Sequence, residues 1–234
     1  GVSIGPTRVL QGPQDRSTAS VAALSVGLDP FASLRRWKPV AVVKLRGVRV
    51  DLQRNPDGAY WVPGPAGTDP PPRLDLNIQL LDPAQVKVSP AQLDVRLAGR
   101  AAVHLDQSWT DAKVQMTLPD HGKVALRLKG GWRQPQLDAQ ARIEKLQLRS
   151  LQGLLPDQQP IGLQGQLAGD LRLGWTAGKA HCKGGLSLAG FALTSSALPA
   201  PLRNDQWQLT CRGDRLQLPR STWVYGPYTA LLQG

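Results

Sequence analysis

Hydrophobic and polar residues alternate one by one along most of this chain. Residues 124–129 read Val-Ala-Leu-Arg-Leu-Lys, and residues 93–97 read Leu-Asp-Val-Arg-Leu. A period of two places apolar side chains on one face of a β-strand and polar ones on the other. The same alternation covers residues 74–80, 112–118, 137–143, 167–175, 207–211 and 216–218. Gly, Pro, Asn and Asp separate these segments, so the pattern predicts about a dozen strands in an antiparallel meander.

Helical signals are confined to two short segments. Asp29 can cap a helix over residues 29–36, and Pro30 suits its first position. A second short helix is predicted over residues 148–155, where leucines recur at helical spacing before Pro156. Residues 63–73 are rich in Pro and Gly and are predicted to form a loop.

So many one-sided strands present a wide aliphatic face, and something must cover that face. One solution is a sandwich or closed barrel, in which the apolar faces cover each other. The other is a curved open sheet whose inner face holds acyl chains. Aromatic residues make up only 5% of the chain, and Phe occurs only at positions 31 and 191. A smooth lining of Leu, Val, Ile and Ala suits aliphatic chains, so the composition leans toward the open sheet.

The candidate lining of such a groove consists of the aliphatic residues of one parity on each strand. A charged substitution there, such as Val95→Asp, is expected to block the groove without unfolding the sheet. The candidate lining residues are Leu24, Val26, Leu28, Val48, Val50, Leu52, Leu74, Leu76, Ile78, Leu80, Val86, Val88, Leu93, Val95, Leu97, Val103, Leu105, Val114, Met116, Leu118, Val124, Leu126, Leu128, Leu137, Ile143, Leu163, Leu167, Leu171, Leu173, Leu186, Leu188, Leu209, Leu216 and Leu218.

The chain carries a net charge of +11, and residues 31–54 alone contribute +6. Anionic surfaces are therefore the candidate partners. Nucleic acid is disfavoured, because only Phe31 and Trp37 could stack on bases within the basic stretch. A basic cluster beside a short helix fits an anionic bilayer surface, although a merely solvated face explains it equally well. The candidate headgroup-binding residues are Arg35, Arg36, Lys38, Lys44, Arg46 and Arg49.

Catalytic and metal-binding patterns are weak. His104 and Asp106 share the outward face of a strand, and neither His121 nor His181 is spaced to activate a nucleophile. Two cysteines and three scattered histidines show no metal-ligand spacing. We therefore expect no enzyme, no metal and no cofactor. Cys182 and Cys211 are both predicted to point inward, either as a disulfide or as two separate thiols.

Residues 19–62 contain an ordered series of parts. An alternating strand leads into a short helix, and residues 43–54 then form a strand pair that closes on Asn-Pro-Asp-Gly and Trp61. This series resembles the N-terminal unit of the AsmA-like superfamily, and in particular of its TamB branch. One departure is that two residues, Ala59 and Tyr60, separate the turn glycine from Trp61.

A second resemblance lies in residues 143–175. Leucines spaced through residues 146–155 precede a run of Gly and Leu from Gly162 to Trp175. This order looks like the recurring strand, short helix and strand of TamB proteins. The form of the chain, with Ser-Ile-Gly-Pro-Thr near its start, is similar to cyanobacterial and chloroplast relatives. The chain begins at Gly1 and its single Met is Met116, so we expect a processed or excised piece, with a secretion signal or a membrane anchor upstream. It has no apolar run of 18 residues, so we expect no bilayer-spanning helix within it.

The resemblance implies an all-β fold: an elongated, curved antiparallel sheet of the β-taco type with one or two short helices. Residues 1–62 would be the N-terminal groove unit, 63–73 a loop, and 74–160 and 161–234 groove repeats. The function implied is non-enzymatic transport of phospholipid between inner and outer membranes across the periplasm, or across the equivalent chloroplast intermembrane space. The alternative is a scaffold that helps outer-membrane proteins assemble. It would bind a BamA/TamA-like β-barrel through an exposed sheet edge.

Overall fold

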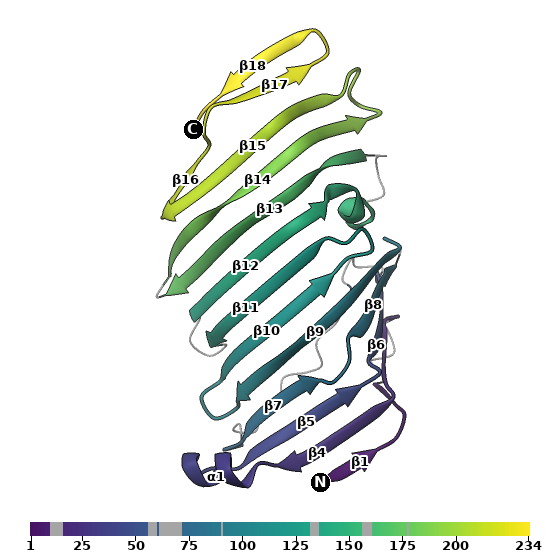
Figure 1. Cartoon of the computed structure of the whole chain (residues 1–234), viewed down its shortest axis with the longest axis vertical. Coiled ribbons are helices and arrows are strands. Elements are labelled where there is room, and N and C mark those ends of the chain that lie inside the picture. Colours follow the sequence, from purple (N-terminus) through teal and green to yellow (C-terminus); the bar gives the residue numbers. More distant parts are fainter. Residues whose placement is uncertain are drawn as a thin grey trace.

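The structure is a computed structural model that describes residues 1–9, 16–55, 60, 72–89, 91–131, 136–155, 161–176 and 178–234. All of its strands belong to one open sheet, which is elongated and curved. The strands cross the long axis of the molecule obliquely, and the two helices are short (Figure 1). The predicted all-β class and elongated curved sheet are therefore confirmed.

The elements follow the chain in a simple order. They are β1 (Val2–Ile4), β2 (Thr7–Val9), β3 (Thr18–Val21), β4 (Ala23–Leu28), α1 (Pro30–Arg36), β5 (Val40–Arg46), β6 (Arg49–Gln53), β7 (Asp75–Leu80), β8 (Ala84–Ser89), β9 (Leu93–His104), β10 (Trp109–Thr117), β11 (Lys123–Gly131), β12 (Gln136–Gln147), the 3₁₀ helix η1 (Leu148–Leu154), β13 (Ile161–Thr176), β14 (Lys179–Ser195), β15 (Leu202–Gly213), β16 (Arg215–Gln217), β17 (Ser221–Tyr225) and β18 (Tyr228–Leu232).

The N-terminal part of the sheet divides into two arms at β9. The second half of β9 pairs with β7, and that arm continues through β5 and β4 to β1. The first half of β9 pairs with β8, and that arm continues through β6 and β3 to β2. The strands β3 and β4, β5 and β6, and β7 and β8 are thus consecutive halves of sharply bent strands, with one half in each arm. The bends line up, so the sheet changes direction along one line.

Small residues and a carboxylate build this bend. Gly47 has φ +62°, and an added Cβ would lie 2.6 Å from Cβ of Ala22. The amide of Gly47 donates to the Asp82 carboxylate, with the nearer oxygen at 3.0 Å. Only glycine tolerates both the backbone conformation and the close approach. The bends at Ala22, Gly47 and Asp82 are therefore stacked on neighbouring strands.

From β9 onward the strands are long and antiparallel, each paired with the next as far as β15. Two pairings in the N-terminal arms are parallel, between β5 and β7 and between β6 and β8. The predicted meander was wholly antiparallel and had fewer strands. The parallel pairings arise because β7 starts at the same end of the sheet as β5 and runs in the same direction. The number of strands is larger because the bends divide long strands into two.

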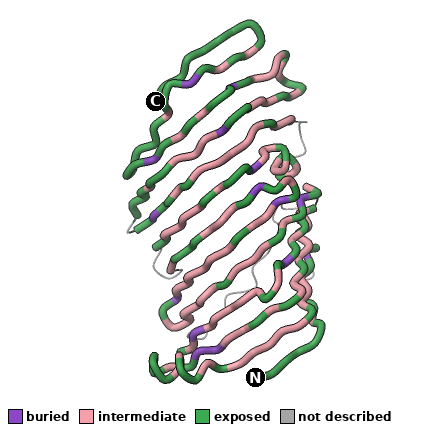
Figure 2. Tube along the Cα trace, viewed as in Figure 1, coloured by how far each residue is buried: buried purple, intermediate pink, exposed green. Residues whose placement is uncertain are grey.

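Among the residues that the structure describes, no second layer covers the sheet. The accessible surface is 15,931 Å², whereas a compact protein of this mass exposes about 10,300 Å². Only eight apolar residues are buried among those that the structure describes. Figure 2 shows these buried positions scattered along the strands rather than gathered in a central core. The sandwich and the closed barrel are therefore not the fold of this chain.

Both helices lie where the sequence predicts them. The Asp29 carboxylate caps α1 by accepting from the amide of Ala32 at 2.9 Å, and Pro30 occupies the first helical position. The second helix is a 3₁₀ helix, η1, rather than an α-helix. Pro156, Trp61 and most of the predicted loop 63–73 fall outside the described residues. No helix in the described part of the chain has the length and hydropathy to cross a bilayer.

Candidate functional site: the apolar face of the sheet

Register aligns the apolar side chains of successive strands on one face, which we call the apolar face. Val43 of β5 lies opposite Ile78 of β7, and Ile78 lies opposite Ala101 of β9. The row continues across β10 to β13 through Ala112, Leu128, Ala139 and Leu173. Residues in register share a face of a sheet, so this row crosses seven strands without a polar side chain.

Parallel rows extend the apolar face on both sides. Leu97, Met116, Val124 and Ile143 stand in register across β9 to β12, and Leu186 and Leu209 continue that row on β14 and β15. No strand position on this face of β4, β5 or β7 to β15 carries a charged side chain in the described register from Leu24 to Cys211. The Lys and Arg residues of these strands alternate onto the other face, which we call the outer face.

The apolar face follows the bend into both arms. Leu45 lies on one arm, and Val50 and Val86 lie in register on the other. All three are half-buried, whereas Arg46 and Arg49 on the outer face of the bend are exposed. Residues on the inside of a bend are shielded by the opposite arm even when no layer covers them. The apolar face therefore lines a trough.

Part of the apolar face is open to solvent. Leu128, Leu137 and Trp175 line a hollow of about 490 Å³ near the ends of their strands. The exposed fractions of these residues are 37%, 39% and 42%, and Leu173 beside them is 46% exposed. Large apolar side chains this exposed, and contiguous across three strands, mark a binding surface.

The opposite margin of the face is closed by η1. Leu93, Leu118 and Leu146 are buried there, and Leu151 of η1 packs against them. Gly153 lets η1 approach the start of β9, since a Cβ at that position would lie 2.5 Å from the Ala91 carbonyl oxygen. This cluster is the main sealed core of the described residues. It closes one margin of the trough and leaves the other open.

The predicted lining is largely the lining that register assembles. The exceptions lie outside the strands, next to strand ends; they are Val48, Leu74, Leu105, Leu118 and Leu218. The sequence reasoning missed Val43 and Leu45 on β5 because it treated that stretch as a basic cluster. Their period-two spacing was the available signal. It also missed Trp175, which closes the row Leu137–Trp175.

A charged cluster holds α1 against the corner of the sheet. The Asp75 carboxylate is 2% exposed and lies 2.6 Å from a guanidinium nitrogen of Arg36, 2.5 Å from Lys38 Nζ and 2.9 Å from His104 Nδ1. Lys38 also contacts Asp106 at 2.7 Å. Burial alone would raise the pKa of Asp75, but the hydrogen bonds from Lys38, His104 and Arg36 outweigh it and lower that pKa.

The predicted headgroup residues are thereby divided among three places. Arg36 and Lys38 are held in ion pairs, and Lys44 lies on the outer face of β5. Arg46 and Arg49 flank the bend, while Arg35 is exposed on α1. The structure does not bring the six together into one patch.

The exposed surface of α1 is instead apolar. Phe31, Leu34 and Trp37 are 86%, 68% and 89% exposed, and Leu28 at the end of β4 is 70% exposed. Arg35 accompanies them. We call these residues the α1 tip. They add a cluster of exposed large apolar side chains beside the end of the apolar face.

Cys182 and Cys211 form a disulfide between β14 and β15 on the apolar face. Each cysteine lies opposite a glycine, Gly213 and Gly184 respectively, which leaves room for the bridge. His181 covers Gly174, and His121 occupies a turn with φ +65°. Within the described ranges, no group of three or more His, Cys, Asp or Glu side chains could hold a metal ion.

We compared the chain with protein-family models, with curated proteins and with solved structures, and none of the three comparisons gave a match. The chemistry of the site therefore rests on its own geometry. An uncharged aliphatic trough offers volume and van der Waals contact without hydrogen-bonding groups. Such a surface can hold hydrocarbon chains, but it cannot orient a polar substrate.

Proposed function

We propose that this chain is a non-enzymatic segment of a lipid-transfer protein, in which the apolar face carries phospholipid acyl chains while their headgroups stay in water. One observation carries the proposal: among the described residues, a continuous face without charged side chains crosses successive strands, and only its margin under η1 is covered. From β4 to β15 the face spans nine inter-strand steps, or about 43 Å at a strand spacing of 4.8 Å.

The energetics of such a trough favour movement along it. Each buried methylene stabilises a bound chain by about 0.8 kcal/mol, so an acyl chain is held firmly. Because Leu, Val and Ala recur at every strand, a chain that shifts by one strand exchanges equivalent contacts. The binding energy is therefore nearly constant along the trough, and that condition allows sliding.

The resemblance to the TamB branch supports a setting for this activity. We place the segment in a protein anchored in the inner membrane that crosses the periplasm or the equivalent chloroplast space. The membrane anchor would lie upstream, and phospholipids would be the cargo. The α1 tip, with its exposed Trp37, Phe31 and Arg35, suits the interface of an anionic bilayer.

A transfer assay with charged variants tests this proposal. The double variant Leu128→Asp/Leu173→Asp places carboxylates on the open part of the apolar face, where both side chains are at least 37% exposed. Val95 is a poorer position, because it packs against the buried cluster under η1. The matched control is Gln115→Asp/Gln208→Asp, which adds the same charge at exposed positions of the outer face.

We expect the apolar-face variant to slow phospholipid transfer between vesicles by roughly tenfold or more, since a charge in a hydrocarbon environment is costly. The control should transfer at the wild-type rate. Both variants should keep the wild-type melting temperature. Equal rates in all three proteins would exclude the apolar face as the lipid path.

A second candidate function is a scaffold that binds a β-barrel partner by strand addition. The observation that favours it is β18, an edge strand in which all five residues are exposed. Leu231 is 56% exposed there. An uncharged edge of this kind can accept another strand. Thr229→Lys/Leu231→Lys should abolish capture of a purified outer-membrane barrel and leave lipid transfer unchanged, whereas unaltered capture would remove this candidate.

A further inference from the structure

Six cations of the outer face stand in one register row across the middle of the sheet. Arg100 of β9 lies opposite Lys113 of β10, and Lys113 lies opposite Arg127 of β11. Gln140 of β12 continues the row, and Arg172, Lys183 and Arg212 follow on β13, β14 and β15. We call the six charged residues the cationic ladder. It crosses six inter-strand steps, or about 29 Å.

The cationic ladder is electrostatically unfavourable for the sheet itself. Like charges directly opposite each other on neighbouring strands destabilise the pairing. Among the described residues, only Arg172 of the six forms an ion pair, with Asp138 at 2.5 Å. The adjacent row has Lys129 in register between Asp111 and Asp138, so opposite charges alternate there. Unfavourable local features of this kind are expected at functional sites, and an anion bound along the row would relieve the repulsion between its cations.

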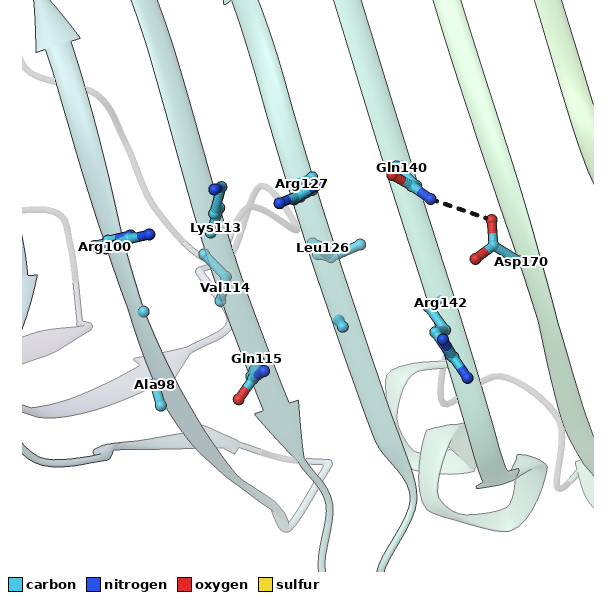
Figure 3. Close-up of a pocket in the computed structure, with 12 residues that line it drawn as sticks. Ala98, Arg100, Lys113, Val114, Gln115, Leu126, Arg127, Gln140, Arg142 and Asp170 are labelled. Carbon is cyan, nitrogen blue, oxygen red and sulfur yellow. Dashed lines mark hydrogen bonds between the residues drawn. The ribbon is translucent and has the colours of Figure 1, made fainter.

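The ladder borders a depression in the outer face. Arg100, Lys113 and Arg127 lie side by side across three strands (Figure 3), and the small residues Ala98 and Ala125 leave a hollow of about 560 Å³ beside them. Gln140 adjoins Arg127 in the same row and donates to Asp170 at 3.5 Å. Three cations along one side of a hollow form a receptor for an anionic group.

We propose that the cationic ladder binds a linear polyanion made of successive phosphate groups. A chain laid across the strands would meet a cation at nearly every strand. A flat anionic bilayer would instead also meet the carboxylates of Asp111, Asp138 and Asp170, which flank the row. No member of the row is aromatic, so phosphate groups rather than stacked bases are the recognised chemistry.

This site is independent of the lipid-binding trough. Arg127 alternates along β11 with Leu126 and Leu128, so the ladder and the apolar face lie on opposite sides of one sheet. Loss of ladder function therefore does not require loss of lipid transfer, and the two proposals can fail separately.

Binding of inorganic polyphosphate to the full chain tests the ladder. The ladder variant is Arg100→Gln/Lys113→Gln/Arg127→Gln. The matched control, Lys87→Gln/Arg96→Gln/Lys123→Gln, removes the same charge from exposed positions of the outer face in other rows. Affinity is measured at about 50 and about 200 mM salt, because phosphate contacts give a characteristic salt dependence. Inorganic phosphate, a single-stranded oligonucleotide and vesicles of anionic lipid are the comparison ligands.

We expect the ladder variant to bind polyphosphate roughly tenfold or more weakly, and the slope of log affinity against log salt to fall by about 2, as three lost contacts require. The control should stay within about twofold of wild type, since it keeps every ladder contact. The ladder variant should melt at the same or a higher temperature, because repulsion has been removed.

Three results would overturn the assignment. Equal weakening in both variants would reduce the effect to net charge. Vesicles that bind through the ladder at concentrations where polyphosphate does not would make the partner a membrane. An oligonucleotide that binds far more tightly than polyphosphate of equal charge would show that bases, not phosphate groups, are recognised.

Discussion

At the scale of single residues, Asp75 is the most heavily contacted charge in the described chain. It joins the C-terminal end of α1, the first residue of β7 and the last residue of β9. Its carboxylate is buried but faces three nitrogen donors, which compensates for lost hydration. Asp75 thus holds the C-terminal end of α1 at the corner of the sheet, together with the hydrogen bonds that join Val40 of β5 to Asp29 and Ser33.

Replacing Asp75 with Asn should destabilise the protein by about 1–3 kcal/mol at neutral pH, because three donors lose a charged acceptor at a buried position. The pKa of Asp75 is lowered in the folded protein. Its stabilisation is therefore full above the ordinary carboxyl pKa of about 3.9 and is lost as the pH falls through the lowered value. Urea unfolding from neutral pH to acid should show the wild-type advantage shrinking only in that acidic range. An advantage that is constant down to the lowest pH would contradict this assignment.

The alternation of residues predicts which side chain faces which side of a strand, but not which distant charges meet. His104 is on the outer face of β9, as the sequence indicates, whereas Asp106 lies in the turn that follows β9 and not on the strand. Their partners Asp75 and Lys38 are 29 and 68 residues away. Only the order of strands brings them together. The disulfide was one of two alternatives for the same reason, since inward orientation alone does not establish adjacency.

At the scale of elements, the two helices close and extend the apolar face at different places. η1 buries Leu146 and its neighbours, whereas α1 exposes its own apolar side chains. Both helices are predictable from leucine spacing, a capping Asp and a following Pro. Their roles are not, because the packing surface of η1 includes β9, which is distant in the sequence, as well as the neighbouring β12 and β13.

The α1 tip gives a direct prediction for membrane contact. Phe31→Ser/Leu34→Ser/Trp37→Ser should weaken binding to anionic vesicles by about tenfold or more, since each lost side chain forfeits 1.5 kcal/mol or more of burial. The matched control is Val224→Ser/Leu231→Ser/Leu232→Ser, which removes exposed apolar groups from β17 and β18. Vesicle co-sedimentation measures both. Equal loss in the two variants would mean that the tip has no special place in membrane binding.

Two leucine truncations distinguish a sealed face from an open one. Leu146→Ala, in the buried cluster, should cost about 2–4 kcal/mol in the free energy of unfolding. Leu173→Ala should cost less than about 1 kcal/mol, because that side chain is 46% exposed. Chemical denaturation measures both values. A large cost at Leu173 would show that another layer covers the apolar face.

At the scale of the whole molecule, the chain forms one curved sheet with a polar outer face and an apolar face. The sequence predicts the two sides because a period of two survives every twist of a strand. It does not predict the parallel pairings of β5 with β7 and β6 with β8, nor the bend at Gly47. Those features depend on the path between strands, which hydrophobic alternation does not encode.

The candidate site was likewise predictable in part from the alternation of residues and in part not. Most lining residues were predictable one strand at a time, and the choice between a sealed and an open face was not. That choice is a property of the assembled sheet. No second layer packs on its strands in the described part of the chain, and the accessible surface is about half as large again as that of a compact protein.

The most direct measurement is photo-cross-linking of bound lipid. A photoreactive amino acid is placed at Leu128 on the apolar face, at Lys129 on the outer face of the same strand, or at Leu146 under η1, and each protein is irradiated with phospholipid vesicles. We expect a phospholipid adduct on the acyl chain at position 128 and none at position 129 or 146. Equal adducts at positions 128 and 129, or none at position 128, would contradict the claim that the uncovered face holds lipid chains.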